Sequence, residues 1–529
     1  MWVWTLVKWL LLGLLDALGI LALVTLGFDS QWTLLGILGF GLILTNVVLM
    51  LPHAYPLRYI LPGLIFFAAF VVYPMLYSVY LSLTNLSTGH LLSKAQVIDQ
   101  LQGQLLRWED SQTLTYWAYG DAQGEAILLL LKGSDEGWWL ATLADRSLQA
   151  IDPADARLSD ADGDGVFDQV DGLGRLQGGA LAQQMGTFEN TIFPYGEDVI
   201  RVSSLREFRT YKRQFHYDPQ SDQVTQHYRF DEPTQRWMAV EPAKVLRADE
   251  GQGFFVAEDG VVLTPGWQVW VGWSNYLDTF RNPRIVAPFL GVFSWTVAFA
   301  LLSVLLTFGL GLLLAMLLND EGMRFRRYYR ALLILPWAIP SFISIMVWRG
   351  LLNPLGPASS LLDSLFGIAI PWFNDPFWAK AGIILLNLWL GFPYMMTITL
   401  GALQGISGEL YEAAYVDGAS RWKQFRTITF PLLLVAVGPL LVGSFAYNFN
   451  NFNVIFLFTG GGPPIPGAQT PAGSSDILIS YTYQVAFNGG WGQQYGFAAA
   501  ITIGIFLLVG VISAVNFKFT GALEEVSQD

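Results

Sequence analysis

The sequence of 529 residues contains no cysteine, and only 13% of its residues are charged. The absence of cysteine excludes disulfides, thiolate metal sites, iron–sulfur clusters and cysteine nucleophiles. A soluble globular chain has about 25% charged residues, roughly twice the fraction found in this chain. Because 53% of the residues are hydrophobic, polar side chains are too few to cover a water-exposed surface. The composition therefore predicts a membrane protein.

Two further absences concern function. The sequence contains no G-x-x-x-x-G-K-[ST] loop, the phosphate-binding motif of ATP-hydrolysing enzymes. The formal net charge is −13 at pH 7, which argues against a nucleic-acid partner. We therefore expect a non-catalytic chain, and any energy derived from ATP must come from a partner.

The charges are concentrated in one segment. Residues 85–287 hold 17 Lys and Arg and 29 Asp and Glu, whereas the other 326 residues hold 12 and 13. Runs of about 20 apolar residues predict eight membrane spans at roughly 9–28, 32–51, 59–84, 287–318, 330–352, 377–403, 428–457 and 496–519. The predicted organisation is three transmembrane helices within 1–84, an inserted domain at 85–286 and five transmembrane helices within 287–529.

Cations in the short loops indicate the orientation. The loops 52–58, 319–330 and 404–427 contain Lys or Arg, whereas 29–31, 353–376 and 458–495 contain none. Cytoplasmic loops carry the excess of cations. We therefore expect both termini in the cytoplasm and residues 85–286 outside the inner membrane. The first span is interpreted as an uncleaved anchor, because its only small-x-small site, at 17–19, lies in the middle of the apolar run.

The inserted domain is predicted to be mainly β. Short aromatic or β-branched segments bounded by Gly, Asp or Pro are typical of strands, as at 114–119, 126–131, 253–257 and 268–273. We expect a helix at 203–214 and a β-sandwich overall.

An acidic loop in this domain has the spacing of a calcium-binding loop. Carboxylates stand at positions 1, 3, 5, 9 and 12, and Gly165 stands at position 6; the carboxylates are Asp160, Asp162, Asp164, Asp168 and Asp171. Two interpretations stay open, a structural calcium site or a solvated acidic turn. A D-x-D motif, as in metal-dependent glycosyltransferases, is a further alternative.

The most specific pattern lies in the loop 404–431. It reads Glu412-Ala413-Ala414, then three residues and Gly418, then nine residues and Ile428-Thr-Phe-Pro431. Small alanines let another surface approach closely, and glycine permits a sharp turn between two short helices. Glu412, near the first turn, is expected to cap the helix or to form a charge pair. The pattern fits a docking element for a motor subunit or a plain amphipathic helix ended by glycine.

This pattern resembles the EAA loop of binding-protein-dependent ABC importer permeases, E-A-A-x3-G-x9-I-x-L-P, with Phe430 in place of Leu. The stretches 390–396, 444–452, 459–463 and 470–473 are similar to the larger permease subunit of maltose/maltodextrin importers. So is the order of three spans, a large external domain and five spans. The resemblance implies an α-helical type I ABC importer permease with a mainly β extracytoplasmic insert.

The same resemblance implies the partners. They are a smaller second permease, an ATPase homodimer that binds ATP and magnesium, an external sugar-binding protein, membrane lipid, and maltose or maltodextrin as cargo. Glu412, Ala413, Ala414 and Gly418 would couple to the ATPase, which drives alternating access to a midplane site. The outer loop 458–495, long for a connector, would contact the sugar-binding protein. No cofactor is expected on this chain apart from the open question of calcium.

Polar side chains within the span 428–457 suggest a cargo site. One helical face carries Ser444, Tyr447, Asn448 and Asn451. Amides, hydroxyls and an aromatic ring suit a neutral sugar, and the absence of charge disfavours ions and amino acids. The alternative is hydrogen bonding between helices. The resemblance adds Trp337, Leu390, Gly391 and Tyr394 to the predicted sugar-binding residues.

Two functions of other classes stay open from the residues alone. The Asp160/Asp162 pair is compatible with a polytopic membrane glycosyltransferase. A stand-alone secondary transporter is the other alternative, although the spans carry almost no acid for ion coupling, with Asp16 the main exception.

Overall fold

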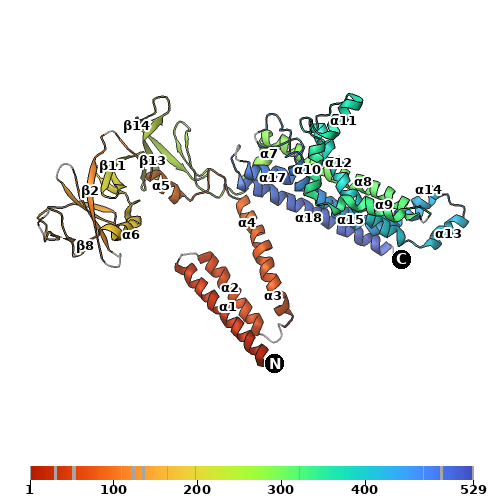
Figure 1. Ribbon diagram of the computed structural model, residues 1–529, viewed down its shortest axis with the longest axis horizontal. Helices are drawn as coiled ribbons and strands as arrows, with labels where there is room; N and C mark the ends of the chain where they lie inside the picture. Colours follow the sequence, from red (N-terminus) through yellow and green to blue (C-terminus); the bar gives the residue numbers. More distant parts are fainter. Residues whose placement is uncertain are drawn as a thin grey trace.

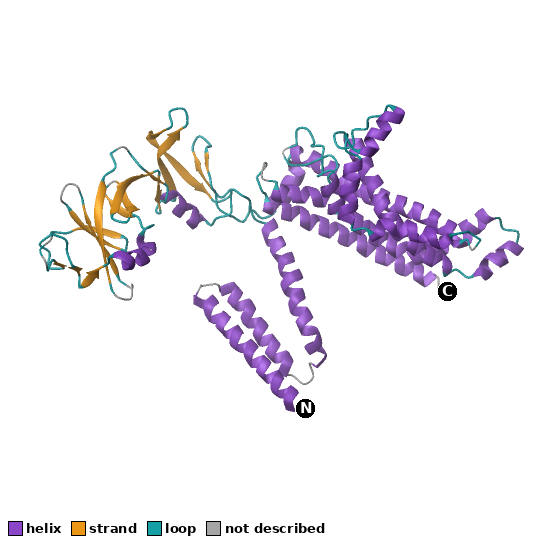
Figure 2. Cartoon of the chain, in the orientation of Figure 1, coloured by secondary structure: helices purple, strands orange, loops and turns teal. Residues whose placement is uncertain are grey.

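The computed structural model describes residues 2–526 except 29–31, 51–54, 109, 122–125, 134–136, 162, 164, 197, 321, 469 and 489–491. Figure 1 shows an N-terminal set of helices, a strand-rich domain and a C-terminal helical bundle. The strands of the described chain are confined to the middle part, as Figure 2 shows. The predicted helical membrane protein with a large, mainly β insert is therefore confirmed.

Four helices precede the insert. They are α1 Trp2–Phe28, α2 Trp32–Met50, α3 Tyr55–Phe67 and α4 Tyr73–Ser82, and a π-helical turn, η2 Ala68–Val72, joins α3 to α4. α1 packs against α2, where Asn46 Nδ2 donates a hydrogen bond to Asp16 Oδ1 at 2.7 Å. The acid that stood out inside the first span thus has an amide partner within the same hairpin. α4 contacts α18 Tyr495–Val526 of the bundle.

The first sheet of the insert is antiparallel and has the order β5-β4-β3-β2-β11-β10-β9, with β1 beside β11 and β8 beside β2. Helix α6 Gly178–Phe188 packs on it and buries Phe188 in its core. The strands are β1 Leu105–Leu106, β2 Thr113–Gly120, β3 Ile127–Lys132, β4 Trp138–Thr142, β5 Ser147–Ala150, β6 Leu158–Ser159, β7 Gln169–Val170, β8 Leu173–Arg175, β9 Phe193–Tyr195, β10 Asp198–Ser204 and β11 Glu207–Arg213.

The second sheet has the antiparallel order β12-β13-β14-β15-β16. Its strands are β12 Phe215–Asp218, β13 Gln223–Asp231, β14 Arg236–Asp249, β15 Phe254–Ala257 and β16 Val262–Leu263. Helix α5 Lys94–Gln102 buries Val97 and Leu101 in the core of this sheet. A capping box formed by Ser93 and Gln96 fixes where α5 begins.

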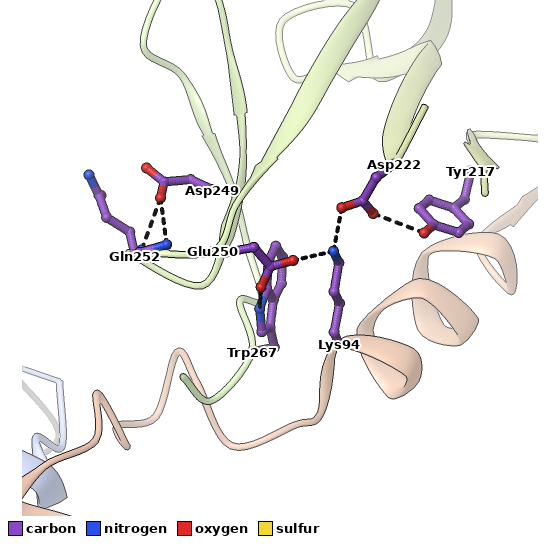
Figure 3. Close-up of polar contacts among 8 residues, drawn as sticks. Lys94, Tyr217, Asp222, Asp249, Glu250, Gln252 and Trp267 are labelled. Carbon is purple, nitrogen blue, oxygen red and sulfur yellow. Dashed lines mark hydrogen bonds and ion pairs between the residues drawn. The ribbon is translucent and has the colours of Figure 1, made fainter. Parts of the chain in front are cut away.

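A cluster of polar contacts attaches the start of α5 to the second sheet (Figure 3). Lys94 Nζ contacts Asp222 Oδ2 at 2.6 Å and also hydrogen-bonds to Glu250, and it lies 5.2 Å from the ring centroid of Trp267. The Tyr217 hydroxyl donates to Asp222 Oδ1 at 2.9 Å. Two carboxylates thus surround a lysine at a helix N-terminus, where a cation alone would be unfavourable.

Two predictions about the insert are wrong. Residues 203–214 form the end of β10 and all of β11 rather than a helix. Burial alternates with a period of two there, since Phe208 and Thr210 are buried whereas Arg209 and Tyr211 are partly exposed. The two sheets also do not form a sandwich. Each described sheet has its own core, which contains α6 in the first and α5 in the second.

The bundle begins with α7 Ser274–Arg281 and the long helix α8 Pro283–Asn319, which packs along α12 and α15. Gly311 permits the approach of α8 to α12, because a Cβ atom there would lie 2.7 Å from Met395 Cβ. The remaining helices are α9 Arg326–Ala338, α10 Ser341–Leu351, α11 Pro357–Phe366, α12 Pro376–Gln404, α13 Gly408–Val416, α14 Arg421–Gln424, α15 Phe430–Phe449, α16 Phe452–Phe458 and α17 Leu478–Phe487, with the π-helical turn η3 Phe425–Thr429 before α15.

Among the described helices, up to six of the eight predicted spans are long and apolar enough to cross a membrane. Five segments are long and apolar enough to cross a membrane, namely Gly63–Ser82, Ile285–Asn319, Pro376–Gln404, Arg421–Phe449 and Tyr495–Ile512. α9 and α10 pass the same test together but are bent by 90° between them, as in a broken span or a re-entrant loop. α1 and α2 contain the shorter apolar stretches Leu12–Phe28 and Leu34–Val48. The sequence had not indicated the bend. It follows from Pro340, which keeps Ile339 in an extended conformation with ψ 132°.

Candidate functional site

A cavity of about 760 Å³ lies between the α9–α10 break, α12, α15 and α16. Its size is within the range of small-molecule sites, roughly 300–1,000 Å³. All eight residues predicted to bind sugar line it: Trp337 at the break, Leu390, Gly391 and Tyr394 on α12, Ser444, Tyr447 and Asn448 on α15, and Asn451 directly before α16. The fold thus brings three separate stretches of the chain around one space.

Two interruptions of helix shape this cavity. The first is the bend around Pro340, and the second is the break at Asn450–Asn451 between α15 and α16. The sequence had predicted a continuous span at 428–457, so the second break is a correction. Non-helical backbone at membrane depth is tolerated where it lines a cavity. Asn451, at the break, lines this cavity.

Three buried amides form a network on the wall of the cavity. Asn387 Nδ2 donates to Asn448 Oδ1 at 2.8 Å, and Asn451 Nδ2 donates to Asn387 Oδ1 at 3.4 Å. Asn448 Nδ2 donates to the backbone oxygen of Ser444 at 2.8 Å. The three side chains are therefore held in fixed orientations, and their remaining hydrogen-bonding positions are available to the cavity.

Asn387 was not among the predicted residues. It lies on α12 one turn before Leu390 and Gly391, and it lines the same cavity. An amide inside an otherwise apolar span was the signal that could have identified it.

Aromatic rings form the exposed part of the wall. Tyr447 is 69% exposed and Trp337 is 58% exposed. The rings of Trp337 and Tyr394 lie 6.2 Å apart between centroids, at an interplanar angle of 47°. Such surfaces can stack on the apolar face of a sugar ring while the amides bind its hydroxyls.

Gly391 has a second role that the sequence did not reveal. A Cβ atom at this position would lie 2.8 Å from Thr307 Cγ2 on α8. The missing side chain therefore allows α12 to pack against α8, while the Gly391 backbone lines the cavity.

No charged side chain lines the cavity among the residues that the structure describes. The polar groups are amides, hydroxyls and backbone, and the rest of the wall is apolar or aromatic. This chemistry suits a neutral, hydroxyl-rich ligand and offers no counter-ion to a charged one.

The loop predicted to couple to the ATPase contains a pair of short helices, α13 and α14, at the far end of the bundle (Figure 1). α13 begins after Ser407, whose side chain accepts a hydrogen bond from the Glu409 backbone amide, and Gly418 makes the turn with φ +73°. Glu412 lies in the middle of α13 and is exposed. The expectation that Glu412 caps the helix is therefore wrong, because Ser407 occupies the capping position. The Tyr411 hydroxyl lies 2.9 Å from Thr429 Oγ1 and ties α13 to the following span.

Apolar side chains extend the exposed surface of this loop. Tyr415 is 79% exposed, Val416 84% and Trp422 70%, and Ala413 is also exposed whereas Ala414 is half-buried. The sequence motif had singled out the small residues but not these three large ones. Tyr415 and Val416 lie outside the segments that can cross a membrane, and Trp422 lies at the start of Arg421–Phe449. Exposed apolar groups on a loop are typical of a surface that a partner covers.

The acidic loop 160–171 is described only in part, because Asp162 and Asp164 lie outside the described residues. Asp160 accepts hydrogen bonds from the backbone amides of Gly163 and Gly165 at 2.8 and 3.2 Å, and Asp168 accepts one from Ala161 at 3.0 Å. Within the described residues, no group of three or more His, Cys, Asp or Glu could hold a metal. Calcium binding therefore stays a prediction, with Asp171 also untested as a ligand.

Two family models match parts of this chain. The family described as "Binding-protein-dependent transport system inner membrane component" matches residues 307–519, and "N-terminal of TM subunit in PBP-dependent ABC transporters" matches residues 65–140. A bacterial ABC transporter involved in the import of the acidic polysaccharide alginate aligns with 48% of this chain and 84% of its own at 23% identity and a TM-score of 0.42.

Curated relatives match over most of the chain. The maltose/maltodextrin transport system permease protein of Vibrio cholerae is 37% identical over 90% of this chain and 88% of its own length. The corresponding protein of Escherichia coli is 35% identical over 97% of this chain and 96% of its own. The chain therefore belongs to the family of maltose/maltodextrin transport system permease proteins, multi-pass inner-membrane subunits of ABC transporters whose ATPase is a separate chain.

Proposed function

We propose that the cavity between α9, α10, α12, α15 and α16 is the site through which this permease carries maltose and maltodextrins. The observation that carries the proposal is the uncharged lining of the cavity, which consists largely of amides, aromatic rings and apolar groups. All eight predicted residues belong to this lining. The names of the relatives, which specify maltose and maltodextrin, support the same cargo. Neither alternative, a membrane glycosyltransferase or a secondary transporter, has support from the comparisons.

Transport by the reconstituted importer tests this site. Asn448→Ala removes an amide from the wall and is expected to reduce maltose uptake about fivefold to 150-fold, because the loss of a hydrogen bond in a buried site costs about 1–3 kcal/mol. The subunit composition of the purified complex, measured in parallel, should be unchanged. Full uptake by Asn448→Ala in a correctly assembled complex would refute the site.

The partners follow from the same family membership. We propose that a smaller second permease completes the channel, that an ATPase homodimer receives the α13–α14 helix pair, and that an external sugar-binding protein delivers the cargo. Glu412, Ala413, Ala414 and Gly418 would form the coupling contact. Sugar-stimulated ATP hydrolysis that persists after deletion of 409–421 would exclude this coupling role.

The proposed orientation places both termini and the α13–α14 pair in the cytoplasm and residues 85–286 outside. Because the chain contains no cysteine, single cysteines can be introduced without a background. An impermeant thiol reagent applied to intact cells should label Leu205→Cys in the insert and leave Val416→Cys unlabelled. The reverse pattern would invert the topology.

Calcium remains a separate proposal for the acidic loop. Binding would rigidify residues 160–171, so limited proteolysis of the full chain in this segment should accelerate when a chelator is added and slow again with calcium. An unchanged cleavage rate would favour the solvated acidic turn.

A further inference from the structure

The outer loop between α16 and α17 contains a single charged residue. Residues 458–495 include no Lys, Arg, His or Glu, and Asp476 is their only Asp. Its side chain is nevertheless only 1% exposed. A lone carboxyl in a loop is ordinarily solvated, so its complete burial requires an explanation.

The loop is built around this carboxyl group. Asp476 Oδ2 accepts a hydrogen bond from the Gly473 backbone amide at 2.8 Å, and Oδ1 lies 2.7 Å from Ser480 Oγ. Gly461, with φ +85°, lies directly over the group, since a Cβ atom there would be 2.1 Å from Oδ1. The backbone therefore closes on Asp476 from both ends of the loop.

No cation compensates the carboxyl among the residues described. No Lys, Arg or His nitrogen lies within 4.0 Å of it, and the titratable group that faces it is Tyr481 on α17. Lys380 on α12 instead lies over the ring of Trp295, whose Nε1 donates to the Ser475 backbone oxygen. Burial raises the pKa of Asp476 to about 7, against the opposite effect of the hydrogen bonds from Ser480 and Gly473.

The geometry around Ser480 can accommodate a proton on Asp476. Ser480 Oγ lies 2.7 Å from Asp476 Oδ1 and 3.0 Å from the Ile477 backbone oxygen, and it accepts a hydrogen bond from the Ile477 amide. When Asp476 is protonated, Oδ1–H donates to Ser480 Oγ, and the Ser480 hydroxyl donates to Ile477 instead. Every donor and acceptor of this pair is then used without a buried charge.

The closed loop also fixes the end of a helix that lines the cavity. α16 starts directly after Asn451, and its C-terminal neighbour Thr459 lies 2.9 Å from Ser475 between the side-chain oxygens. Ser475 in turn donates to the Gly462 backbone oxygen at 2.6 Å. The residue next to Asp476 thus connects the loop to α16.

We propose that Asp476 is a positioning residue for transport, whose protonated carboxyl holds the outer loop closed and so fixes α16 against the cavity. The proposal rests on the cavity being the transport site. In the open loop the carboxyl is solvated and ionises near its ordinary value of 3.8. Closing the loop then requires uptake of a proton above pH 3.8, so the closed loop loses stability as pH rises towards about 7, where the closed form also ionises. Above that pH no further loss is expected.

Hydrogen exchange of residues 459–477 in the assembled importer tests the proposal. After correction for the intrinsic pH dependence of exchange, the opening constant of the wild-type loop should rise by up to about tenfold per pH unit between pH 5 and about pH 7 and then level off. Asp476→Asn, which cannot ionise, should show no such slope. Thr482→Val is the matched control, since Thr482 is buried on α17, the helix that follows Asp476, and its hydroxyl donates to the Leu478 backbone oxygen. It should change the size of the opening constant but keep the wild-type slope.

Each outcome decides the question. A wild-type loop without a pH slope overturns the proposal even where the variants fail to assemble, and so does a slope that survives in Asp476→Asn. Maltose transport should decline over the same pH range in the wild type and not in Asp476→Asn; superimposable profiles would refute the link to transport. Failure of the transport site itself would appear separately, as unchanged uptake by Asn448→Ala at constant pH.

Discussion

Asn387 Nδ2 donates a hydrogen bond to Asn448 Oδ1 at 2.8 Å, which joins α12 to α15 at the wall of the cavity. Both side chains are more than 90% buried. The bond orients the Asn448 amide towards the space where the cargo is proposed to bind. The two residues are 61 positions apart in the sequence, so the pair forms only in the folded bundle.

Replacement of Asn387 by Leu should therefore weaken transport although Asn448 is unchanged. Asn448 would lose its donor, and an unsatisfied buried polar group costs about 1–3 kcal/mol. We expect maltose uptake to fall roughly tenfold to a hundredfold. Thr397→Val, which removes a hydroxyl bonded to Pro393 on the same helix outside the cavity lining, should retain uptake. Equal effects of both changes would contradict a specific role of Asn387.

The ring of Tyr447 is expected to matter more than its hydroxyl. Tyr447 is 69% exposed on the cavity side of α15, and an aromatic contact contributes about 0.5–1.5 kcal/mol beyond area burial. Tyr447→Phe should keep most of the uptake, whereas Tyr447→Ala should lower it about threefold to tenfold. The apparent KM for sugar measures the difference. Loss of transport in Tyr447→Phe equal to that in Tyr447→Ala would argue against stacking.

A methyl group at Gly391 should be accommodated only if α8 shifts away from α12. A Cβ atom at 391 would lie 2.8 Å from Thr307 Cγ2, and overpacking costs about 1–3 kcal/mol. Thermal unfolding of Gly391→Ala should occur at a lower temperature than that of the wild type. Thr307→Ser, which removes the methyl group and keeps the hydroxyl, should restore part of the loss. Gly401→Ala on the same helix is the control, because no atom lies within 4 Å of its Cβ position.

A charge on the exposed apolar surface of α13 should uncouple the ATPase. Val416 is 84% exposed, and placing Asp there would leave a charge unpaired in a covered interface. We expect sugar-stimulated ATP hydrolysis, or recovery of the ATPase with the permease, to fall at least tenfold. Leu205→Asp is the control, since Leu205 is an exposed apolar residue of the insert. Normal stimulation in Val416→Asp would remove this surface from the coupling contact.

The Lys94 cluster should stabilise the attachment of α5 to the second sheet over a wide pH range. Burial alone would raise the pKa of Asp222, but hydrogen bonds from Lys94 and Tyr217 lower it below its ordinary value of 3.8. Burial would likewise lower the pKa of Lys94, but hydrogen bonds to Asp222 and Glu250 raise it above 10.5. The contribution is therefore fully present above pH 3.8 and below pH 10.5. It is lost as pH falls through the lowered value of Asp222 or rises through the raised value of Lys94.

Lys94→Met tests this cluster. The groups are partly exposed, so we expect a loss of only about 1 kcal/mol, or about a fivefold decrease in hydrogen-exchange protection of α5 at neutral pH. Lys132→Met is the matched control, because Lys132 lies over the Trp138 ring at 5.1 Å and no ion pair is recorded for it in the described chain. A uniform effect of Lys94→Met that continues below the pKa of Asp222 would show that packing, rather than the ion pairs, stabilises the attachment.

The sequence predicted the elements whose signal is local. Apolar runs predicted the long helices of the bundle, because each span must satisfy its own backbone hydrogen bonds in lipid, and the motif around Glu412 and Gly418 indicated the helix pair. The polar face at 444–451 was visible as an exception to the apolar pattern. The wrong prediction of a helix at 203–214 also has a local cause. Buried and exposed residues alternate around Phe208, but a short stretch rich in polar residues shows this two-residue period only weakly.

Composition and periodicity by themselves determined that this chain crosses a membrane several times, carries an acidic insert and keeps its polar span face free of charge. Each of these properties depends on one continuous segment and on the solvent around it, so the local sequence is sufficient to predict it. Only the tertiary structure decided which segments meet. It placed Asn387 against Asn448, seated Gly391 on Thr307, gave each sheet its own helix and buried Asp476 without a cation. Such contacts join residues far apart in sequence, and their energies depend on packing and desolvation that no single segment contains.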